Sequence, residues 1–458
     1  MTIKELYKLY QEHPCITTDS RDCPKDSIFL ALKGDNFDGN QFAVAALEKG
    51  CAYAIVDEDI DNSAVANSTL CTLNSKLIRV DNCLQTFKDI AREHRRQFNI
   101  PVIAITGTNG KTTTKELVAA VLQKKFNVLY TQGNFNNDVG VPKTLLRLTA
   151  EHDIAVIEMG ASHPGDIKTL AETAEPTCGL ITNVGRAHLQ GFGSFKNVVK
   201  TKGELYDFLG HRGESLVFLN ADDERLCDIL PDNVWVAPYS TNIDNVEGCT
   251  VGEVVACDPL LKFHWRESDA NLEESSSRRE ESEEPVWYDV QTQLIGSYNI
   301  DNLMAAIAVG LNFGVEPAAI NEALEAYKPS NNRSQLTVTE HNRLVVDAYN
   351  ANPSSMRAAV ENFRQMDVKP KMVILGEMRE LGNSSHKEHQ KLVTMLAESG
   401  LDSVWLVGDE YNDLPASFRH FHDVDEVKAA LQSEQPQGYH ILIKGSNSTR
   451  LYQLPELL

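Results

Sequence analysis

The stretch ITGTNGKTTTKE, residues 105–116, decides the fold of the central part of this chain. The run PVIAIT that leads into it is typical of a buried strand, and the residues after it have the apolar spacing of a helix. A glycine-rich loop between a strand and a helix predicts a phosphate-binding site, because backbone N–H groups and the helix N-terminus point at the anion. The common pattern is G-x-x-x-x-G-K-[ST], but Ile105 stands where its first glycine belongs. The loop is therefore a shortened form, in which Gly107 and Gly110 are the glycines.

Lys111 and Thr112, which follow the second glycine, have side chains suited to a bound nucleotide. The lysine can neutralise the terminal phosphates, and the threonine hydroxyl can reach a magnesium ion. A glycine turn capped by threonines is the alternative interpretation. The agreement of strand, glycines, Lys-Thr pair and helix in one register favours the nucleotide site.

Two further candidates follow apolar runs later in the chain. Glu158 ends the run IAVIE, where a carboxylate could meet the metal of a bound nucleotide. His188 lies in a glycine-containing loop after the run GLITNV. From the residues alone, Glu158 is equally well a turn residue, and a lone histidine is more often structural than a ligand.

Length, charge and cysteine usage restrict the class of protein. A chain of 458 residues is too long for one ordinary core, so several domains are expected. The net charge of -22 argues against a nucleic-acid partner, because an acidic surface repels phosphate backbones. The nine cysteines form no C-x-x-C pair, which is typical of reduced thiols in a cytosolic protein. We find neither a signal peptide nor a run of the roughly 20 apolar residues that spans a membrane.

Alternating strand and helix patterns predict an α/β protein of three domains. A small α/β domain is expected over residues 1–82, a central phosphate-loop domain with a mostly parallel sheet over 83–329, and a Rossmann-like domain over 330–458. Residues 267–285 are polar and charged with few apolar side chains, so we expect a solvated loop or hairpin tip inside the central domain and not a domain linker.

Seven stretches of the chain carry a resemblance to a known family. They are TTDSRDCPKDSIFLALKGDNFDGN (17–40), GTNGKTTTKE (107–116), GNFNNDVGVPKTLL (133–146), IEMGASHPGDI (157–167), NVGRAHLQGFGS (183–194), VVDAYNANPSSMRAA (345–359) and VILGEMRELGNSSHKEH (373–389). Together they resemble the ATP-dependent Mur ligases of cell-wall synthesis. The resemblance covers all three expected domains, and the shortened loop is the form that this family uses.

The resemblance implies an ADP-forming amide ligase that binds ATP and Mg²⁺ and acts in peptidoglycan precursor synthesis. Within the family, the stretch DAYNANP is most similar to members that join D-alanyl-D-alanine to a UDP-N-acetylmuramoyl tripeptide through an acyl phosphate. We expect a cytoplasmic monomer with these two substrates as partners, no nucleic-acid partner and no membrane insertion.

The resemblance also assigns roles at the ATP site. The residues expected to contact ATP are Gly107, Thr108, Asn109, Gly110, Lys111, Thr112, Thr113, Asn299, Asn302, Arg333 and Asp347. The expected metal ligands are Thr112, Glu158, His188 and Lys202, with Lys202 as a carbamate formed from its amine and CO₂. The expected catalytic residues are Lys111, Lys202, His188 and Arg333. Tyr298 stands where the family commonly has histidine, beside the two asparagines expected at the adenine.

A second set of residues is expected to bind the muramoyl substrate. Its members are Ser20, Arg21, Asp35, Phe37, Asp38 and Gly39 at the uridine diphosphate, and Asn134, Asn136, Asn137, Ser162 and Arg186 near the muramoyl peptide. An arginine after an Asp-Ser turn is also a reasonable diphosphate ligand on chemical grounds.

Three alternative functions remain open from the sequence. The first is a related amide ligase, either a Mur-type enzyme that adds a single amino acid or a folate polyglutamylating enzyme. The second is a phosphate-loop kinase or NTPase, against which stand Ile105 and the whole third domain. The third is a non-catalytic binding paralogue, which the presence of the expected catalytic side chains disfavours.

Overall fold

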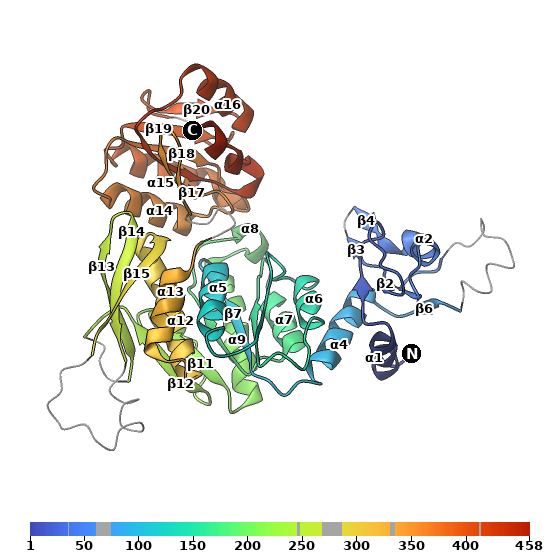
Figure 1. The fold of residues 1–458 in the computed structure, drawn as a ribbon. Helices are drawn as coiled ribbons and strands as arrows, with labels where there is room; N and C mark the ends of the chain where they lie inside the picture. Colours follow the sequence, from blue (N-terminus) through green and yellow to red (C-terminus); the bar gives the residue numbers. More distant parts are fainter. Residues whose placement is uncertain (35, 61–74, 245–247, 268–285, 330–334, 412–413) are drawn as a thin grey trace, which may run out of the picture. The chain divides into compact units, whose positions relative to one another are not determined.

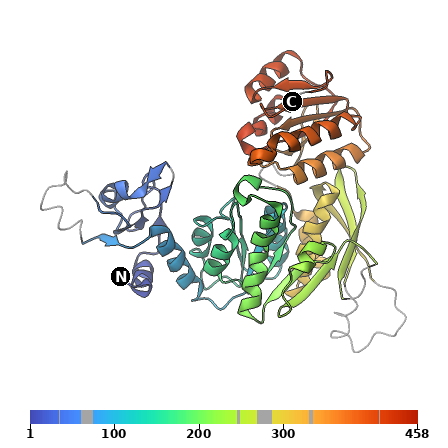
Figure 2. The same cartoon turned by 180° about the vertical axis from the view of Figure 1, so that it is seen from behind.

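The computed structural model describes residues 1–34, 36–60, 75–244, 248–267, 286–329, 335–411 and 414–458 (Figures 1 and 2). Three sequence predictions lie partly or wholly outside these ranges: Asp35, Arg333 and nearly all of the polar segment 267–285. The described chain divides into two compact units. The first comprises Met1–Val102, Leu129–Met159 and Thr169–Pro176, and the second comprises Ile103–Val128, Gly160–Lys168 and Thr177–Leu458.

The first unit contains a small parallel sheet with the strand order β1-β2-β5-β6. These strands are β1 (Ile16–Thr17), β2 (Ile28–Leu30), β5 (Tyr53–Val56) and β6 (Leu77–Arg79). Helices α1 (Ile3–Glu12), α2 (Ala43–Glu48) and α4 (Cys83–Arg95) share a core with this sheet. A short antiparallel hairpin, β3 (Lys33–Gly34) and β4 (Phe37–Asp38), leads into the turn η1 (Gly39–Phe42). The alternation of apolar and polar residues thus gives the expected small α/β fold.

The second unit contains a large mixed sheet with the order β15-β14-β13-β12-β11-β10-β7. Its strands are β7 (Val102–Thr106), β10 (Cys178–Ile181), β11 (Leu216–Asn220), β12 (Trp235–Ser240), β13 (Thr250–Cys257), β14 (Leu260–Arg266) and β15 (Tyr288–Ile295). Strands β7 to β13 pair in parallel, and β13, β14 and β15 pair antiparallel. The strands of the antiparallel extension were not predicted, because buried and exposed apolar side chains are mixed along them, as at Val251 and Val255.

The other helices and strands between residues 111 and 326 belong partly to the first unit and partly to the second. They are α5 (Lys111–Leu122), β8 (Val128–Tyr130), α6 (Gly140–Leu145), β9 (Ile154–Glu158), α7 (Asp166–Ala174), α8 (Leu189–Phe192), α9 (Phe195–Arg212), α10 (Glu224–Asp228), η2 (Ser297–Asn299), α12 (Ile300–Asn312) and α13 (Pro317–Ala326). Strand β7 is buried along its whole length, as the apolar run before the loop predicts.

The C-terminal part of the second unit is a six-stranded sheet with the order β16-β17-β21-β18-β19-β20, in which only β16 is antiparallel. The elements are β16 (Gln335–Val338), β17 (Arg343–Asp347), α14 (Pro353–Gln365), β18 (Lys371–Gly376), η3 (Gly382–Ser384), α15 (Ser385–Ala397), β19 (Ser403–Val407), β20 (Arg419–Phe421), α16 (Val424–Ser433), β21 (His440–Lys444), η4 (Asn447–Thr449), η5 (Leu451–Gln453) and η6 (Pro455–Leu457). Helices cover both faces of this sheet (Figures 1 and 2). Alternate strand residues such as Leu344 and Val345 enter two separate cores, so both faces are buried.

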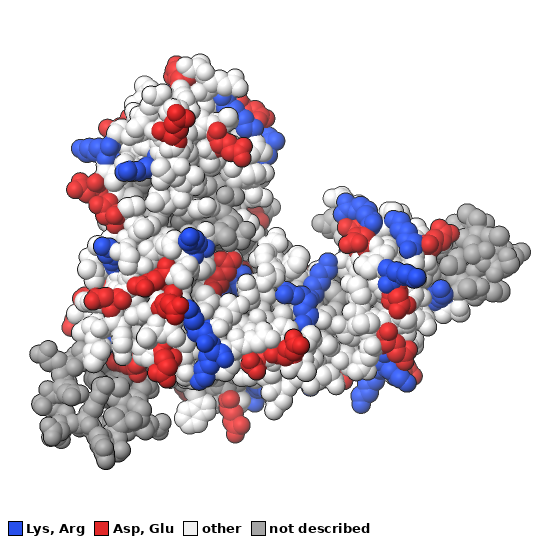
Figure 3. Space-filling model, viewed as in Figure 1, with Lys and Arg blue, Asp and Glu red and all other residues white. Residues whose placement is uncertain are grey.

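The predicted fold class is confirmed: the chain is α/β and its large sheets are mostly parallel. No described helix is both long and apolar enough to cross a membrane. On the face that Figure 3 shows, lysine and arginine side chains are interspersed with aspartate and glutamate.

Candidate active site

The phosphate loop joins β7 to α5 through two glycines whose conformations other residues rarely adopt. Gly107 has φ of 144° and Gly110 has φ of 79°. A Cβ at Gly107 would lie 2.0 Å from Thr182 Oγ1, and one at Gly110 would lie 2.3 Å from Asn302 Oδ1. The shortened loop therefore requires glycine at both positions, for backbone conformation and for space.

Hydrogen bonds fix the loop to the end of β10. Asn109 N–H donates to Asn183 Oδ1 at 3.0 Å, and Asn109 O accepts from Thr182 Oγ1 at 2.6 Å. Thr108 Oγ1 accepts from the N–H of Gly185 at 2.8 Å. The loop is thus held at fixed geometry between two adjacent parallel strands, the arrangement that a preorganised anion site needs.

Lys111 begins α5 and its ammonium group lies over the loop. Its Nζ donates to the carbonyls of Gly107 and Thr108, each at 2.9 Å. Thr112 is 4% exposed, in the first turn of the same helix. The structure therefore places the sequence-predicted loop residues in one site at the helix N-terminus, where the helix dipole also favours phosphate.

Asn299 and Asn302 form a hydrogen-bonded chain against the loop. Asn302 Oδ1 accepts from Thr114 Oγ1 at 2.9 Å, and its Nδ2 donates to Asn299 Oδ1 at 2.9 Å. Asn299 Nδ2 in turn donates to Ile295 O at 2.8 Å. These two amides brace the start of α5, and their expected contact with adenine stays a prediction.

Lys202 lies on α9 and is almost completely buried, with 2% of its surface exposed. Burial lowers the pKa of Lys202 well below the ordinary value of a lysine, and the positive charge of Lys111 lowers it further. Asp166 and Glu204 oppose this shift. Glu204 is itself engaged, because it accepts the N–H groups of Gly165 and Lys168, each at 2.9 Å. The site therefore favours an uncharged amine at Lys202.

His188 lies at the start of α8 with φ of 49° and forms an ion pair through Nδ1 with Glu380. This contact lowers the pKa of Glu380. Gln190 N–H donates to Glu380 O at 3.2 Å, which fixes the same segment. A carboxylate on one ring nitrogen orients the ring, as is usual for a histidine that binds a metal through the other nitrogen.

The start of α14 contacts the phosphate loop. Asn352 Nδ2 donates to Asn109 Oδ1 at 2.7 Å, and Ser354 Oγ accepts the N–H of Arg186 at 3.3 Å. Asn352 also forms a capping box with Ser355, so its position follows from the helix start itself. The DAYNANP stretch thus reaches the nucleotide site through its last asparagine.

Other predicted residues of the second unit have partners within the chain. Asp347 ends β17 and pairs with the buried Lys444 at the end of β21. Ser162 N–H donates to Asp166 Oδ2 at 2.8 Å. Arg186 Nη1 lies 4.0 Å from Glu388 Oε1. Arg333 lies outside the described residues, so its place at the site stays a prediction.

Glu158 belongs to the first unit and is held by two neighbours. Its N–H donates to Thr131 Oγ1 at 3.0 Å, and its Oε1 accepts from Asn136 Nδ2 at 2.8 Å. Asn137 instead accepts the N–H groups of Val139 and Gly140 at 3.2 and 2.8 Å. Asn136 and Glu158 are therefore brought together, whereas Asn137 binds the backbone just before and at the start of α6. The third predicted asparagine, Asn134, is exposed.

The predicted uridine-nucleotide residues lie in two turns of the first unit. Arg21 is exposed and makes a bidentate pair with Asp19, at 2.9 and 2.7 Å, after the buried Ser20. Phe37 stacks on Phe42 with ring centroids 5.3 Å apart.

The turn that follows requires its glycine, because a Cβ at Gly39 would lie 2.6 Å from Leu32 O. Asp38 accepts the N–H of Asn40 at 3.0 Å. Nucleotide binding by these two turns stays a prediction, together with Asp35, which lies outside the described residues.

Sequence reasoning missed the side chains that support the predicted ones. Glu380 orients His188, Glu204 fixes the loop before α7, and Asn183 fixes the phosphate loop. Two of these follow apolar strands directly, in GEMRE and ITN, so a search of every strand end for polar residues could have found them.

A glycine loop of this geometry at a helix N-terminus binds phosphate groups, so the second unit has the site of a nucleotide-binding α/β enzyme. Family models match three segments: "Mur ligase family, catalytic domain" over residues 14–95, "Mur ligase middle domain" over 105–310 and "Mur ligase, glutamate ligase domain" over 332–447. The chain belongs to the Mur ligase family.

Relatives match the chain over almost its whole length. A UDP-N-acetylmuramoyl-tripeptide–D-alanyl-D-alanine ligase of Escherichia coli is 32% identical, over 97% of this chain and 93% of the relative. A crystal structure of MurF from Acinetobacter baumannii has a TM-score of 0.83 at 28% identity, covering 98% and 96% of the two chains. The MurF ligase of Thermotoga maritima, in complex with ADP, has a TM-score of 0.81 at 25% identity, covering 97% and 96%.

Proposed function

We propose that this chain is an ADP-forming ligase that joins D-alanyl-D-alanine to a UDP-N-acetylmuramoyl tripeptide in peptidoglycan precursor synthesis. The similarity to the E. coli ligase over 97% of the chain carries this proposal. The intact phosphate loop and its contact with the DAYNANP stretch support it.

The reaction begins when the terminal carboxylate of the tripeptide attacks the γ-phosphorus of ATP. The bond to the bridging oxygen of ADP breaks, and an acyl phosphate forms. The amine of the dipeptide then attacks the acyl carbon, a tetrahedral intermediate collapses with loss of phosphate, and the amine releases a proton. The chain's task is positioning and charge neutralisation, so no covalent nucleophile is required.

Lys111 and the backbone N–H groups of the loop are suited to stabilise the phosphates during transfer. Lys111 already lies within 2.9 Å of the carbonyls of Gly107 and Thr108, so its charge is fixed at the loop. We also propose that Arg333 approaches the γ-phosphate, and that Asp347 lies at the ribose.

The donor atoms present fit a hard cation such as Mg²⁺. We propose Thr112 and Glu158, which belong to different units of the described chain, as oxygen ligands on the ground of the resemblance, and the Glu380–His188 pair orients an imidazole. In the described residues no group of three or more His, Cys, Asp or Glu side chains forms a metal cluster. A carbamate on Lys202 would add an oxygen ligand where an ammonium would repel the ion, and the burial of Lys202 beside Lys111 supports that modification. When bound, Mg²⁺ offsets the negative charge of the phosphates.

We further propose a cytoplasmic monomer of three domains, with residues 1–82 binding the uridine nucleotide, 83–329 binding ATP and 330–458 completing the site. The three segments matched by family models support this division.

Phosphate release from the purified protein tests the function. We expect release only when ATP, Mg²⁺, a UDP-N-acetylmuramoyl tripeptide and D-alanyl-D-alanine are all present. A bare tripeptide should lose turnover as well as affinity, because remote binding energy positions the carboxylate. Joining of a single amino acid to a UDP-muramoyl dipeptide, or equal ATP hydrolysis without any acceptor, would show that the assignment is wrong.

A further inference from the structure

Helix α14 contacts the nucleotide-binding part of the second unit at two separate places. Its N-cap residue, Asn352, donates to Asn109 Oδ1 of the phosphate loop at 2.7 Å. Asn362, further along the same helix, is 8% exposed, and its Oδ1 accepts the N–H of Ser297 at 3.1 Å. The ten residues between the two asparagines span about 15 Å at about 1.5 Å per residue, so the two contacts are distinct.

The amide oxygen of Asn362 also binds the turn that joins β13 to β14. Cys257 Sγ, a weak donor, lies 3.7 Å from this oxygen. Ile295, at the end of β15, belongs to the same buried core as Phe363 of α14, and Leu260 packs against that core. Polar and apolar contacts together therefore hold the end of β15 against α14.

Ser297 begins the turn η2, which carries Asn299. Asn299 N–H donates to Gly296 O at 3.1 Å, and its Nδ2 donates to Ile295 O at 2.8 Å. The carbonyl of Gly296 and the N–H of Ser297 belong to one planar peptide unit. Asn299 and Asn362 therefore bind opposite edges of the same rigid group, so that a shift of this unit away from α14 would displace Asn299.

We propose that Asn362 is a positioning residue for the nucleotide, which holds Asn299 and Asn302 in the orientation that contacts adenine. Asn302 Nδ2 donates to Asn299 Oδ1, and Asn302 Oδ1 accepts from Thr114 Oγ1, each at 2.9 Å. The hydrogen bonds thus run from α14 through η2 to α5, behind the phosphate loop. The inference rests on the proposed function, because the contact of the two asparagines with adenine is part of that proposal.

The two asparagines of α14 therefore act on different parts of a bound nucleotide. Asn352 contacts the phosphate loop, where all nucleoside triphosphates are alike. Asn362 holds the turn on the side where we expect the base. A buried N–H group that loses its acceptor disfavours its native position. Loss of Asn362 should therefore reduce the preference for adenine, and not only the affinity for triphosphates in general.

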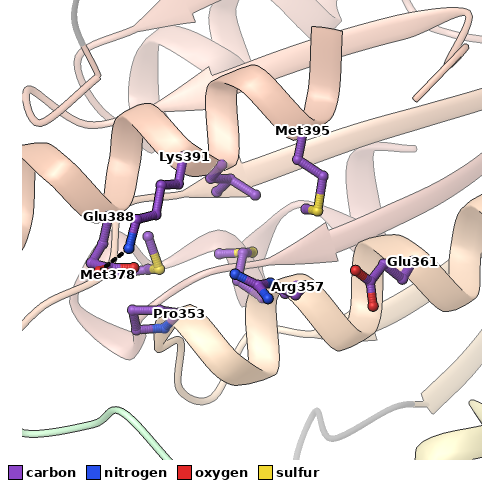
Figure 4. A pocket seen from close by; sticks show the side chains of 9 residues that line it. Pro353, Arg357, Glu361, Met378, Glu388, Lys391 and Met395 are labelled. Atoms are coloured by element: carbon purple, nitrogen blue, oxygen red, sulfur yellow. Dashed lines mark hydrogen bonds and ion pairs between the residues drawn. The ribbon is translucent and has the colours of Figure 1, made fainter. Parts of the chain in front are cut away.

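Asn362 is separate from the cavity of about 260 Å³ that α14 shares with α15 (Figure 4). Arg357 and Glu361 of α14 line this cavity, and Asn362 is not among its lining residues. About 100° of rotation around the helix separates Glu361 from Asn362. A substitution at Asn362 therefore changes no side chain of the cavity lining.

The first test measures binding of the non-hydrolysable imido analogues of ATP and GTP to the full-length protein by calorimetry. Asn362→Leu should weaken binding of the ATP analogue about 10-fold, because the N–H of Ser297 loses its acceptor, and that of the GTP analogue by no more than about twofold. Asn362→Asp keeps an acceptor oxygen and should bind the ATP analogue within about threefold of the unmodified protein. Gln365→Ala, an exposed residue at the end of α14, is the control and should change binding by no more than about twofold. Thermal unfolding of each variant checks the fold.

The second test removes the donor instead of the acceptor. Proline lacks an N–H group and is tolerated at the first position of a helical turn, which Ser297 occupies in η2. Gly296 has φ of 97°, outside the helical region that a following proline disfavours. Ser297→Pro should weaken binding of the ATP analogue by a factor similar to that of Asn362→Leu. The double variant should bind no more weakly than either single variant, because both substitutions remove the same hydrogen bond.

The outcomes separate this inference from the ligase function. Equal weakening of both analogues in Asn362→Leu, unchanged binding in the two single variants, or losses that add in the double variant would overturn the positioning role and leave the ligase function intact. Equal binding of the two analogues by the unmodified protein would overturn the adenine contact on which the inference rests. Failure of the unmodified protein to bind either analogue would contradict the proposed function as well.

Discussion

Two lysines of the second unit are equally buried, but their surroundings differ. Lys444, at the end of β21, is 1% exposed and pairs with Asp347, and it also donates to Asn350 O at 3.2 Å. Lys202, on α9, is 2% exposed and faces the Phe192 ring at 5.8 Å, and within the described residues it makes no hydrogen bond or ion pair. A buried ammonium is tolerated where a carboxylate compensates it, whereas an uncompensated one loses its proton. Lys444 therefore contributes to stability through its ion pair, whereas we propose a chemical role for Lys202.

Replacing Lys202 by methionine gives the largest effect that this contrast predicts. Phosphate release should fall on the order of a thousandfold, because the carbamate that we propose as a metal ligand would be lost. The midpoint of thermal unfolding should not fall, since no ion pair is broken. Lys200→Met, an exposed lysine on the same helix, is the control and should change activity by no more than about twofold. A fully active Lys202→Met enzyme would show that Lys202 has no role in the reaction.

Lys111→Ala should reduce turnover about a hundredfold or more, which corresponds to about 2.7 to 4 kcal/mol of transition-state stabilisation. The reason is the loss of the ammonium group that Lys111 holds on the phosphate loop. Single-turnover phosphate release measures the loss, and circular dichroism checks the fold. Turnover within about tenfold of the unmodified protein, about 1.4 kcal/mol, would contradict the assignment of the loop.

Lys444→Met should act on stability. Breaking a buried pair leaves the other charge uncompensated, so the free energy of unfolding should fall by about 3 kcal/mol. The double variant Lys444→Met with Asp347→Asn should recover part of that loss, because no lone charge remains. Urea unfolding of the unmodified protein, the two single variants and the double variant completes the double-mutant cycle. A loss of unfolding free energy below about 0.5 kcal/mol in Lys444→Met, the usual range for surface substitutions, would show that the pair of Lys444 with Asp347 does not stabilise the fold.

His94 is a third buried basic side chain, and unlike the two lysines its ordinary pKa lies near neutral pH. Burial lowers the pKa of His94, and the ring lies between Tyr7 Oη and Leu148 O, each at 3.0 Å. As the pH falls, His94 is protonated in the unfolded chain at a higher pH than in the folded chain. The stability that its burial contributes is therefore fully present above about pH 6.5 and declines as the pH falls below that value. This is the smallest effect. Unfolding midpoints between pH 8 and pH 5 should depend less on pH in His94→Gln, and an unchanged dependence would assign the decline to other groups.

The phosphate loop could be predicted from the sequence because its determinants are local. Gly107, Gly110 and Lys111 lie within one short stretch, and a buried strand precedes them. Strands β17, β18, β19 and β21 of the C-terminal sheet could be predicted for the same reason, as short apolar runs, whereas β16 and β20 were not predicted. The partners of the predicted residues were not: Glu380 meets His188 only when the turn after β18 folds against α8.

The cavity between α14 and α15 also could not be predicted from the sequence. Arg357 and Glu388 are ordinary helix residues in the sequence, and only the packing of two helices on one face of the sheet places them around a common space. The positions of Arg333 and Asp35 stay predictions from resemblance, since both lie outside the described residues.

The hydrogen bond from Asn352 to Asn109 joins the first turn of α14 to the phosphate loop. A nucleotide that shifts Asn109 would therefore also act on that turn. Thermodynamic coupling is reciprocal, so the factor by which ATP changes the affinity for the dipeptide equals the factor by which the dipeptide changes the affinity for ATP. Asn352→Ala would remove this bond together with the side-chain cap of α14, and we expect the two ligands to bind more independently of one another in that variant.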